Sequence, residues 1–272
     1  MSSVASDAPA TPRAPLVAAA LLGTLLIGAL LAPALAPFAM DALDLANRRA
    51  APSSLHWFGT DELGRDVMTR VLFGARVSLA IGLISALVSA AIGAAVGAIA
   101  GYAGRVADDI LMRITDAMLA IPRLPLLMIT AAVLQPGVPL LVLLVGLAGW
   151  METARVVRAE VMSLAARDFV SAARAVGASP FRVVLRHVLP GVLPAAAVAT
   201  TLAVGRGILL ESALSFFGVG VQPPTASWGN MLYQAQTTMT SEPWLAIFPG
   251  AMIFLTVLAC NAVGDAIGAA RG

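Results

Sequence analysis

The stretch VSLAIGLISALVSAAIGAAVGAIAGYAG, residues 77–104, contains no charged residue. A helix needs about 20 mostly apolar residues to cross the hydrocarbon core of a bilayer, so this stretch is long enough for one membrane span. Four other apolar runs lie before and after it, at residues 14–40, 124–151, 191–217 and 243–264. Among these runs only 191–217 is interrupted by charge, at Arg206 and Glu211. The pattern predicts an all-α integral membrane protein.

The composition points to the same class. Of 272 residues, 59% are hydrophobic and only 12% are charged, and the mean hydropathy is +0.89. A soluble domain is about 45–50% apolar and about 25% charged. This chain therefore has too few charged side chains to cover a water-facing surface.

The residue types exclude several kinds of chemistry. All 17 basic residues are arginine, so the chain has neither the lysine of a P-loop nor an amine for a Schiff base. The single cysteine, Cys260, can form no internal disulfide and no thiolate metal site. A net charge of +2 gives no case for a nucleic-acid surface. We therefore expect no catalytic site, no metal and no cofactor in this chain, and no nucleic-acid partner.

The segment 135–139 decides the number of helices. The charge-free run 124–151 is too long for one span and too short for two, and the Pro136-Gly137 pair in its middle is typical of a tight turn. Adding the flanks 117–123 and 152–157 gives room for two helices. The sequence thus predicts six membrane helices, at about 16–39, 77–101, 117–135, 138–157, 192–217 and 244–265.

The distribution of arginine predicts the orientation. In the six-helix arrangement eleven arginines lie in the loops and termini of one side and five on the other. The side with more arginine is usually cytoplasmic, so both termini are expected there. Residues 1–13 are then a disordered cytoplasmic tail, 14–40 hold the first transmembrane helix and 41–76 form a periplasmic segment. A five-helix arrangement gives a similar bias, so charge does not fix the helix count.

The segment 152–190 is predicted to form two short helices at the membrane surface. The first, about 158–176, places an apolar face on one side. That face consists of Val161, Leu164, Ala165, Phe169, Ala172 and Val176. Gly177 stands where a helix commonly ends, and Ser179-Pro180 is typical of a helix start, so a second helix is expected at 181–189. Such a pair is suited either to docking a cytosolic partner or to anchoring on the lipid surface.

Two parts of this segment resemble a known signature. Residues 168–177 (DFVSAARAVG) and 187–190 (HVLP) are similar to the EAA signature of bacterial ABC-importer permeases, in both pattern and spacing. Two positions differ from it: Ser171 stands where the signature has glutamate, and His187 where it has isoleucine. The first difference removes any salt bridge that a glutamate at position 171 would make.

Other segments narrow the resemblance. Residues 58–67 (FGTDELGRDV), 215–229 (SFFGVGVQPPTASWG) and 243–250 (PWLAIFPG) resemble the C-type permease of dipeptide and oligopeptide importers. Nickel and glutathione importers share these motifs. The resemblance extends over about residues 58–266.

The resemblance implies a fold and a set of partners. The fold is that of a type I ABC-importer permease, with six transmembrane helices, a permease domain at 77–268 and a helix-turn-helix coupling loop at 159–190. The implied partners are a homologous B-type permease, two ATPase subunits that hold ATP and Mg²⁺, an extracytoplasmic peptide-binding protein and the lipid of the bacterial inner membrane. The coupling residues that it implies are Asp168, Ser171, Ala172, Ala173, Gly177, Ala178, Ser179, Pro180, His187, Leu189 and Pro190.

Two charged residues fall within the fifth predicted span. Arg206 and Glu211 are five residues apart and so about 140° apart around a helix, which makes a pair between them unfavourable. Charged groups at membrane depth usually face protein or a water-filled cavity. Each is therefore a candidate for lining the transport pathway, and the alternative for each is a packing contact with a neighbouring helix.

Three alternatives to peptide import remain open from the sequence. Nickel or glutathione uptake would use the same architecture, because a separate binding protein largely sets selectivity. An intramembrane enzyme would need paired catalytic groups in the spans, and none is recognisable. A stand-alone secondary transporter would show inverted halves with interrupted helices at matching positions, and no such repeat is recognisable.

Overall fold

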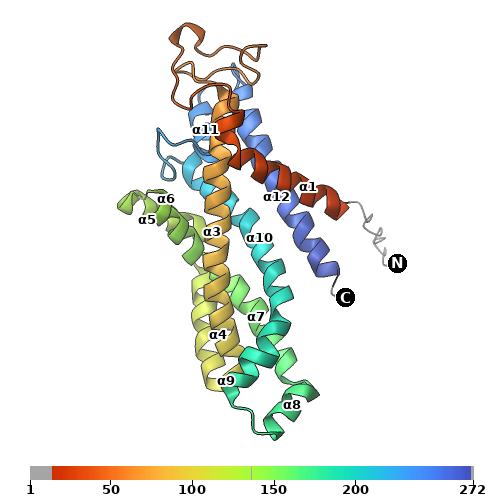
Figure 1. Cartoon of the computed structure of the whole chain (residues 1–272). Helices are drawn as coiled ribbons and strands as arrows, with labels where there is room; N and C mark the ends of the chain where they lie inside the picture. The colour runs from red at the N-terminus through yellow and green to blue at the C-terminus, as the bar shows by residue number, and fades with distance from the viewer. Residues whose placement is uncertain (1–13, 136, 271–272) are drawn as a thin grey trace, which may run out of the picture.

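The computed structural model describes residues 14–135 and 137–270. This part of the chain is nearly all helical; it contains one isolated bridge, between Thr60 and Asp66, and no strand. Figure 1 shows an elongated bundle around α3 (Val67–Tyr102), with the 36–66 loop and α11 (Trp228–Ala235) at one end. At the other end lie α8 (Asp168–Ala175) and α9 (Pro180–Val183). The predicted all-α membrane fold is confirmed.

Three helices are long and apolar enough to cross a membrane by themselves. They are α3, α12 (Trp244–Ala269), and the helix Pro180–Phe216, which consists of α9, a π-helical turn at Val184–Val188 and α10 (Leu189–Phe216). The prediction that α3 begins near residue 77 is wrong by ten residues. Asp66 caps the helix earlier, because its Oδ2 accepts a hydrogen bond from the Thr69 N–H at 2.8 Å. The last part of the 41–76 segment therefore belongs to α3.

The prediction of a third helix at 117–135 is wrong. The chain instead forms α4 (Arg105–Ala120) and α5 (Arg123–Leu134), which meet at an angle of 78°. The break lies at Ile121 and Pro122. A residue before proline is disfavoured in helical geometry, and Ile121 is accordingly extended, with φ −80° and ψ 126°.

The fourth predicted helix, 138–157, is also broken. It forms α6 (Val138–Leu147) and α7 (Trp150–Ala165), bent by 43°. Gly149, at the bend, lies so close to α3 that a Cβ there would be 2.5 Å from Ser89 Oγ. The described residues thus contain up to five spans by length and composition, if each bent pair is counted as one.

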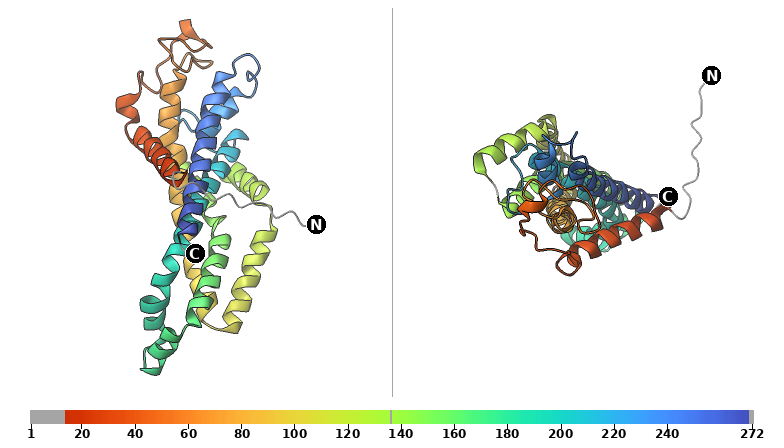
Figure 2. Two further views of the ribbon diagram at one scale, coloured as in Figure 1. Left: turned by 90° about the vertical axis from the view of Figure 1, so that its right-hand side faces the viewer. Right: turned by 90° about the horizontal axis from the view of Figure 1, so that it is seen from above.

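The first apolar run forms a shorter helix than predicted. It contains α1 (Ala14–Leu30) and the single turn α2 (Ala32–Leu35) rather than one helix over 16–39. Seen from above, α1 and the α5–α6 hairpin lie on opposite sides of α3 (Figure 2). The count of six helices across the membrane is reached only when α1 and both bent pairs are included.

A row of glycines brings α3 and α7 into close contact. A Cβ at Gly93 would lie 2.7 Å from both Thr153 Cβ and the Trp150 carbonyl oxygen, and one at Gly97 would lie 2.9 Å from Val157 Cβ. Small residues allow helices to approach closely in lipid, where apolar burial gives little driving force. The glycines of α3 therefore hold this chain's own bundle together.

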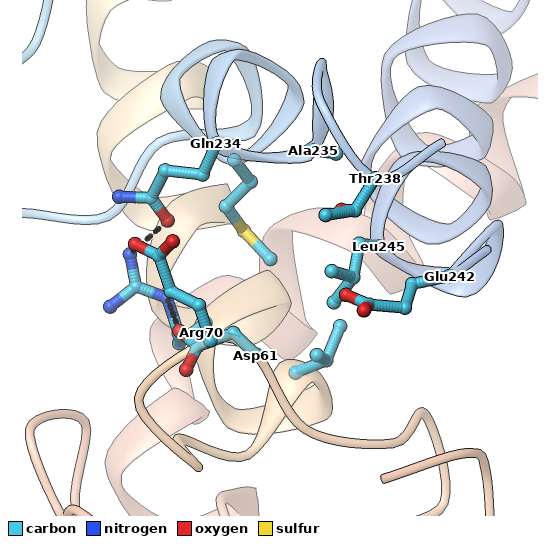
Figure 3. A pocket seen from close by; sticks show the side chains of 10 residues that line it. Asp61, Arg70, Gln234, Ala235, Thr238, Glu242 and Leu245 are labelled. Carbon is cyan, nitrogen blue, oxygen red and sulfur yellow. Dashed lines mark hydrogen bonds and ion pairs between the residues drawn. The ribbon is translucent and has the colours of Figure 1, made fainter. Parts of the chain in front are cut away.

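The end of the bundle that carries the 36–66 loop is held by ion pairs. Figure 3 shows a pocket there between α3, α11 and the start of α12, in which Arg70 reaches Gln234 and Asp61. Asp61 also pairs with Arg65 at 2.6 Å, and Glu242 faces the pocket from the opposite wall. These contacts fasten the loop to α3 and α11, so this end is built as a rigid cap.

Candidate functional site

The loop between α7 and α10 forms the foot of the bundle (Figure 1). The prediction of one helix at 158–176 is wrong in extent, because α7 ends at Ala165 and the chain is extended at Arg167, with φ −76° and ψ 150°. The predicted second helix, 181–189, is one α-helical turn that passes through the π-helical turn into α10. The helix-turn-helix is therefore short, and its second helix is continuous with a long apolar helix.

The turn between α8 and α9 has the helix-capping residues that the sequence predicts. Gly177 has φ +87°, a conformation that side chains disfavour, and its N–H bonds to the Arg174 carbonyl at 2.9 Å. The Ala178 N–H bonds to the Ala173 carbonyl at 3.1 Å, which completes a Schellman motif. Ser179 Oγ then accepts from the Arg182 N–H at 3.4 Å at the start of α9. Both predicted helix boundaries, the glycine end and the serine-proline start, are confirmed.

The foot has its own small core. It is built from six buried valines: Val157, Val161, Val170, Val183, Val188 and Val192. Val170 anchors α8, Val183 and Val188 anchor the turn into α10, and Ala173 and Ala178 pack beside them. Branched aliphatic side chains have few rotamers, so this core holds the two short helices in a defined position on α7.

The outward side of the foot is apolar as well. Phe169 and Val176 were predicted to face inward with Val161, but they are 47% and 89% exposed, because Val170 takes the inward position. Phe181 (74% exposed) on α9 and Leu185 on the π-helical turn are exposed as well, and these four side chains are hereafter called the foot surface. Four arginines of the same segment lie exposed around it: Arg167, Arg174, Arg182 and Arg186. An apolar patch rimmed by polar residues is typical of an interaction site.

The residues of the EAA-like signature all lie in this foot. Its exposed members are Asp168, Ser171, Ala172, Gly177, Ser179, Pro180 and Pro190. Its partly buried members are Ala173, Ala178, His187 and Leu189. Ser171 and Ala172 thus face away from the valine core, and the segment offers small side chains on its outer side.

A second group of charged residues lies where the two bends meet α10. Glu152, in the first turn of α7, pairs through Oε1 with Arg123 Nη2 at 2.8 Å and through Oε2 with Arg206 Nη1. Arg123 is the first residue of α5, directly after the 78° bend. We call Arg123, Glu152 and Arg206 the charged cluster. All three side chains are partly exposed.

Glu211, one and a half turns beyond Arg206 on α10, is fully buried. Its carboxyl group accepts hydrogen bonds from Ser78 Oγ at 3.0 Å and Ser215 Oγ at 2.8 Å. Ser78 Oγ in turn accepts the Trp228 N–H at 3.1 Å. As expected, Arg206 and Glu211 do not pair with each other. Glu211 joins α3, α10 and α11 through one polar network.

Replacing Glu211 with leucine is expected to destabilise the protein. The hydroxyls of Ser78 and Ser215 would lose a buried acceptor, which costs about 1–3 kcal/mol for each group left unsatisfied. Glu211→Gln keeps an acceptor oxygen and should therefore lose less stability than Glu211→Leu. Thermal unfolding of the detergent-purified proteins measures this. The melting temperature should fall from wild type to Glu211→Gln and again to Glu211→Leu. A leucine variant as stable as wild type would contradict this role.

The sequence analysis did not identify Arg123 and Glu152 as site residues. The signal was present, since the two charges close the two ends of the apolar run 124–151 and an antiparallel hairpin brings its ends together. In the described residues, no group of three or more His, Cys, Asp or Glu is arranged to hold a metal ion.

Comparison with known proteins identifies a family and several relatives of this chain. Residues 93–270 match the family model described as "Binding-protein-dependent transport system inner membrane component". A Brucella suis protein named as a peptide permease is 41% identical over 94% of this chain and 85% of its own length. Permease protein GsiD of the glutathione transport system of Escherichia coli O6:K15:H31 is 40% identical over 89% of this chain and 80% of its own length.

A solved structure shares the fold. The inward-facing MetNI methionine ABC transporter matches with a TM-score of 0.63 and 20% sequence identity, over 75% of this chain and 97% of the matched chain. The family model and the relatives extend over most of the chain, so they establish its family. The shared fold agrees with that family. The chain belongs to the family of inner-membrane components of binding-protein-dependent transport systems, and it is a permease subunit of an ABC importer.

Proposed function

We propose that this chain forms half of the pathway by which an ATP-driven importer carries di- and oligopeptides across the inner membrane. The observation that carries the proposal is the 41% identity, over 94% of the chain, to a relative named as a peptide permease. Glutathione, itself a small peptide, is the second candidate, because a relative named for its transport is 40% identical. A homologous B-type permease would supply the other half of the pathway.

The foot surface is proposed to receive the ATPases. Phe169, Val176 and Phe181 are exposed there beside small residues of the EAA-like signature, and the valine core holds them rigidly on α7 and α10. Two ATPase subunits would bind ATP and Mg²⁺, and this lysine-free chain would bind neither and catalyse no reaction of its own. A closing movement of the ATPases would act on α8 and α9, and the bundle would transmit it.

The same proposal includes an orientation of the chain in the membrane. The foot and both termini lie on the cytoplasmic side, and the 36–66 loop with α11 lies on the periplasmic side. The division of arginines supports this direction, since ten still fall on the foot side against five on the other when Arg123, a member of the charged cluster, is left out. The ion-paired cap around Asp61 and Arg70 would then face an extracytoplasmic peptide-binding protein. Arg206 would lie on the pathway, with Glu211 buried behind it as a structural support.

The coupling proposal is tested by changing Phe181 to aspartate. A charge in the middle of the foot surface should weaken association with the ATPase subunits by about tenfold or more, since a desolvated aromatic anchor carries much of an interface's energy. Co-purification of the complete importer on a tagged ATPase measures the loss, and peptide uptake should fall with it.

Leu45→Asp is the matched control. Leu45 is 62% exposed, comparable to Phe181, but it lies in the 36–66 loop at the opposite end of the bundle. It should leave ATPase association unchanged. The coupling proposal fails if Phe181→Asp co-purifies as wild type does. The substrate proposal fails if the intact importer, with its binding protein, imports no peptide.

A further inference from the structure

The charged cluster lies at the point where the helices are broken. Arg123 follows the bend between α4 and α5, and Glu152 follows the bend between α6 and α7. Glu152 bonds both Arg123 and Arg206 of α10. Arg206 is far from either end of the apolar helix that carries it. Broken helices in membrane proteins often mark binding sites, since the irregular backbone is tolerated only beside protein or a water-filled cavity.

The cluster carries a net charge of +1. Two guanidinium groups share one carboxylate, and the side chains of Arg206, Glu152 and Arg123 are 42%, 35% and 22% exposed in the free chain. A charge exposed to hydrocarbon would be costly, so the open side of the cluster must face water or protein. In the proposed importer that open side faces the pathway or the partner permease, and in the first case the cationic group can meet a solute.

The hydrogen-bonding groups around the cluster suit an oxyanion. Arg123 and Arg206 line a small pocket of about 20 Å³ with Ser85 and Ser89 of α3. The two serine hydroxyls already donate to the Gly82 and Gly146 carbonyls, so the free donors are those of the two guanidinium groups. Each guanidinium uses one terminal nitrogen on Glu152, and no bond from its other N–H groups is found in the described residues. A planar guanidinium with free N–H groups matches a carboxylate in geometry.

We propose that the charged cluster is a transient binding site for the free carboxylate of the transported peptide. The inference rests on the proposed function, peptide import. The incoming carboxylate would replace Glu152 on Arg206, and Glu152 would retain Arg123. Because Glu152 competes for the same guanidinium, binding stays weak enough for release, as conduction through any pathway requires.

Uptake of two matched peptides tests this. One has a free C-terminal carboxylate and the other a C-terminal amide, and both must first be shown to bind the purified binding protein. The complete importer is reconstituted with Arg206→Gln, Glu152→Gln or wild-type chain, and the ratio of acid uptake to amide uptake is compared. The contribution of the binding protein to this ratio cancels between variants.

The two variants should shift the ratio in opposite directions. Arg206→Gln removes one guanidinium and should lower the acid-to-amide ratio about tenfold, whereas Glu152→Gln removes the competing carboxylate and should raise it. A merely structural role would lower uptake of both peptides equally and leave the ratio unchanged, which would overturn the inference. If Arg206→Gln fails to accumulate, Arg123→Gln replaces it: Glu152 then loses its second partner and stays on Arg206, so the acid-to-amide ratio should again fall.

Arg155→Gln is the control. Arg155 also lies on α7 and forms an ion pair, with Asp116 at 2.5 Å, but the pair is exposed and belongs to the α4 side of the bundle. Its loss should leave the ratio unchanged, since exposed pairs contribute little. If the wild-type importer takes up neither peptide, the proposed function fails and the inference fails with it. Uptake with an unchanged ratio in Arg206→Gln overturns the inference alone.

Discussion

Valine at Gly177 is expected to reduce ATP-driven uptake by about tenfold or more while the protein still reaches the membrane. Gly177 has φ +87°, and a β-branched residue in this region costs about 1–2 kcal/mol. No atom lies within 4 Å of a Cβ placed there, so the substitution creates no clash inside the chain. The strain is relieved by redirecting α9 relative to α8. The foot would then meet its ATPase in the wrong geometry.

Two further variants separate the causes. Gly177→Asn should retain most of the uptake if backbone conformation is what matters, because asparagine tolerates positive φ, and little if bulk at the contact is what matters. Gly28→Val is the control, since Gly28 lies in α1 with open space around it and no positive φ. The measurements are uptake and substrate-stimulated ATPase activity of the complete importer. Unchanged values of both in Gly177→Val would refute the coupling role.

Leucine at Gly97 is expected to destabilise the protein strongly, because α3 and α7 are packed against each other at this residue. A Cβ there would already lie 2.9 Å from Val157 Cβ and 3.0 Å from the Arg158 nitrogen. Inserting even small groups into a packed interface costs about 1–3 kcal/mol, and leucine adds three carbons beyond Cβ. We expect α3 and α7 to separate and the amount of folded protein to fall sharply.

The yield and thermal unfolding of detergent-purified protein measure this effect. Gly28→Leu is the matched control, because it adds the same side chain at a position of α1 where a Cβ would have no neighbouring element within 4 Å. It should behave as wild type. A Gly97→Leu chain with wild-type yield and melting temperature would show that the α3–α7 contact does not depend on the small residue.

The signals that predicted correctly are local ones. Gly177, Ser179 and Pro180 were placed at helix boundaries from residue type alone, because positive φ and helix capping are properties of one to four consecutive residues. The apolar runs around α3, α10 and α12 were found because the bilayer sets a minimum length for any span. The presence and position of the foot followed from the same reasoning.

The errors arose where a long apolar run hid a break. The prediction of a helix over 117–135 passed through Pro122, although the proline itself indicated the extended conformation of Ile121. In the foot, the apolar pattern assigned Phe169 and Val176 to the interior, because periodicity does not show which face will meet a partner. An interaction surface is apolar for the same reason as a core.

The charged cluster could not be predicted from local sequence. Glu152 is 29 residues from Arg123 and 54 from Arg206, and only the return of the chain through the α5–α6 hairpin and the foot brings the three together. Sequence spacing identified Arg206 and Glu211 as charges within a span. Tertiary contacts gave them different surroundings, with Arg206 paired at a partly open surface and Glu211 enclosed by serines.

The helix from Pro180 to Phe216 has a mechanical consequence. It is continuous over 37 residues and therefore about 55 Å long at 1.5 Å per residue. It carries Phe181 at one end, Arg206 further along, and Glu211 near the other end. Under the proposed coupling such a helix would act as a rigid rod: a tilt of about 5° imposed at Phe181 would displace the far end by about 5 Å, nearly one helical pitch. A small stroke by a neighbouring motor would thus move the guanidinium of Arg206 and the anchored Trp228 segment together.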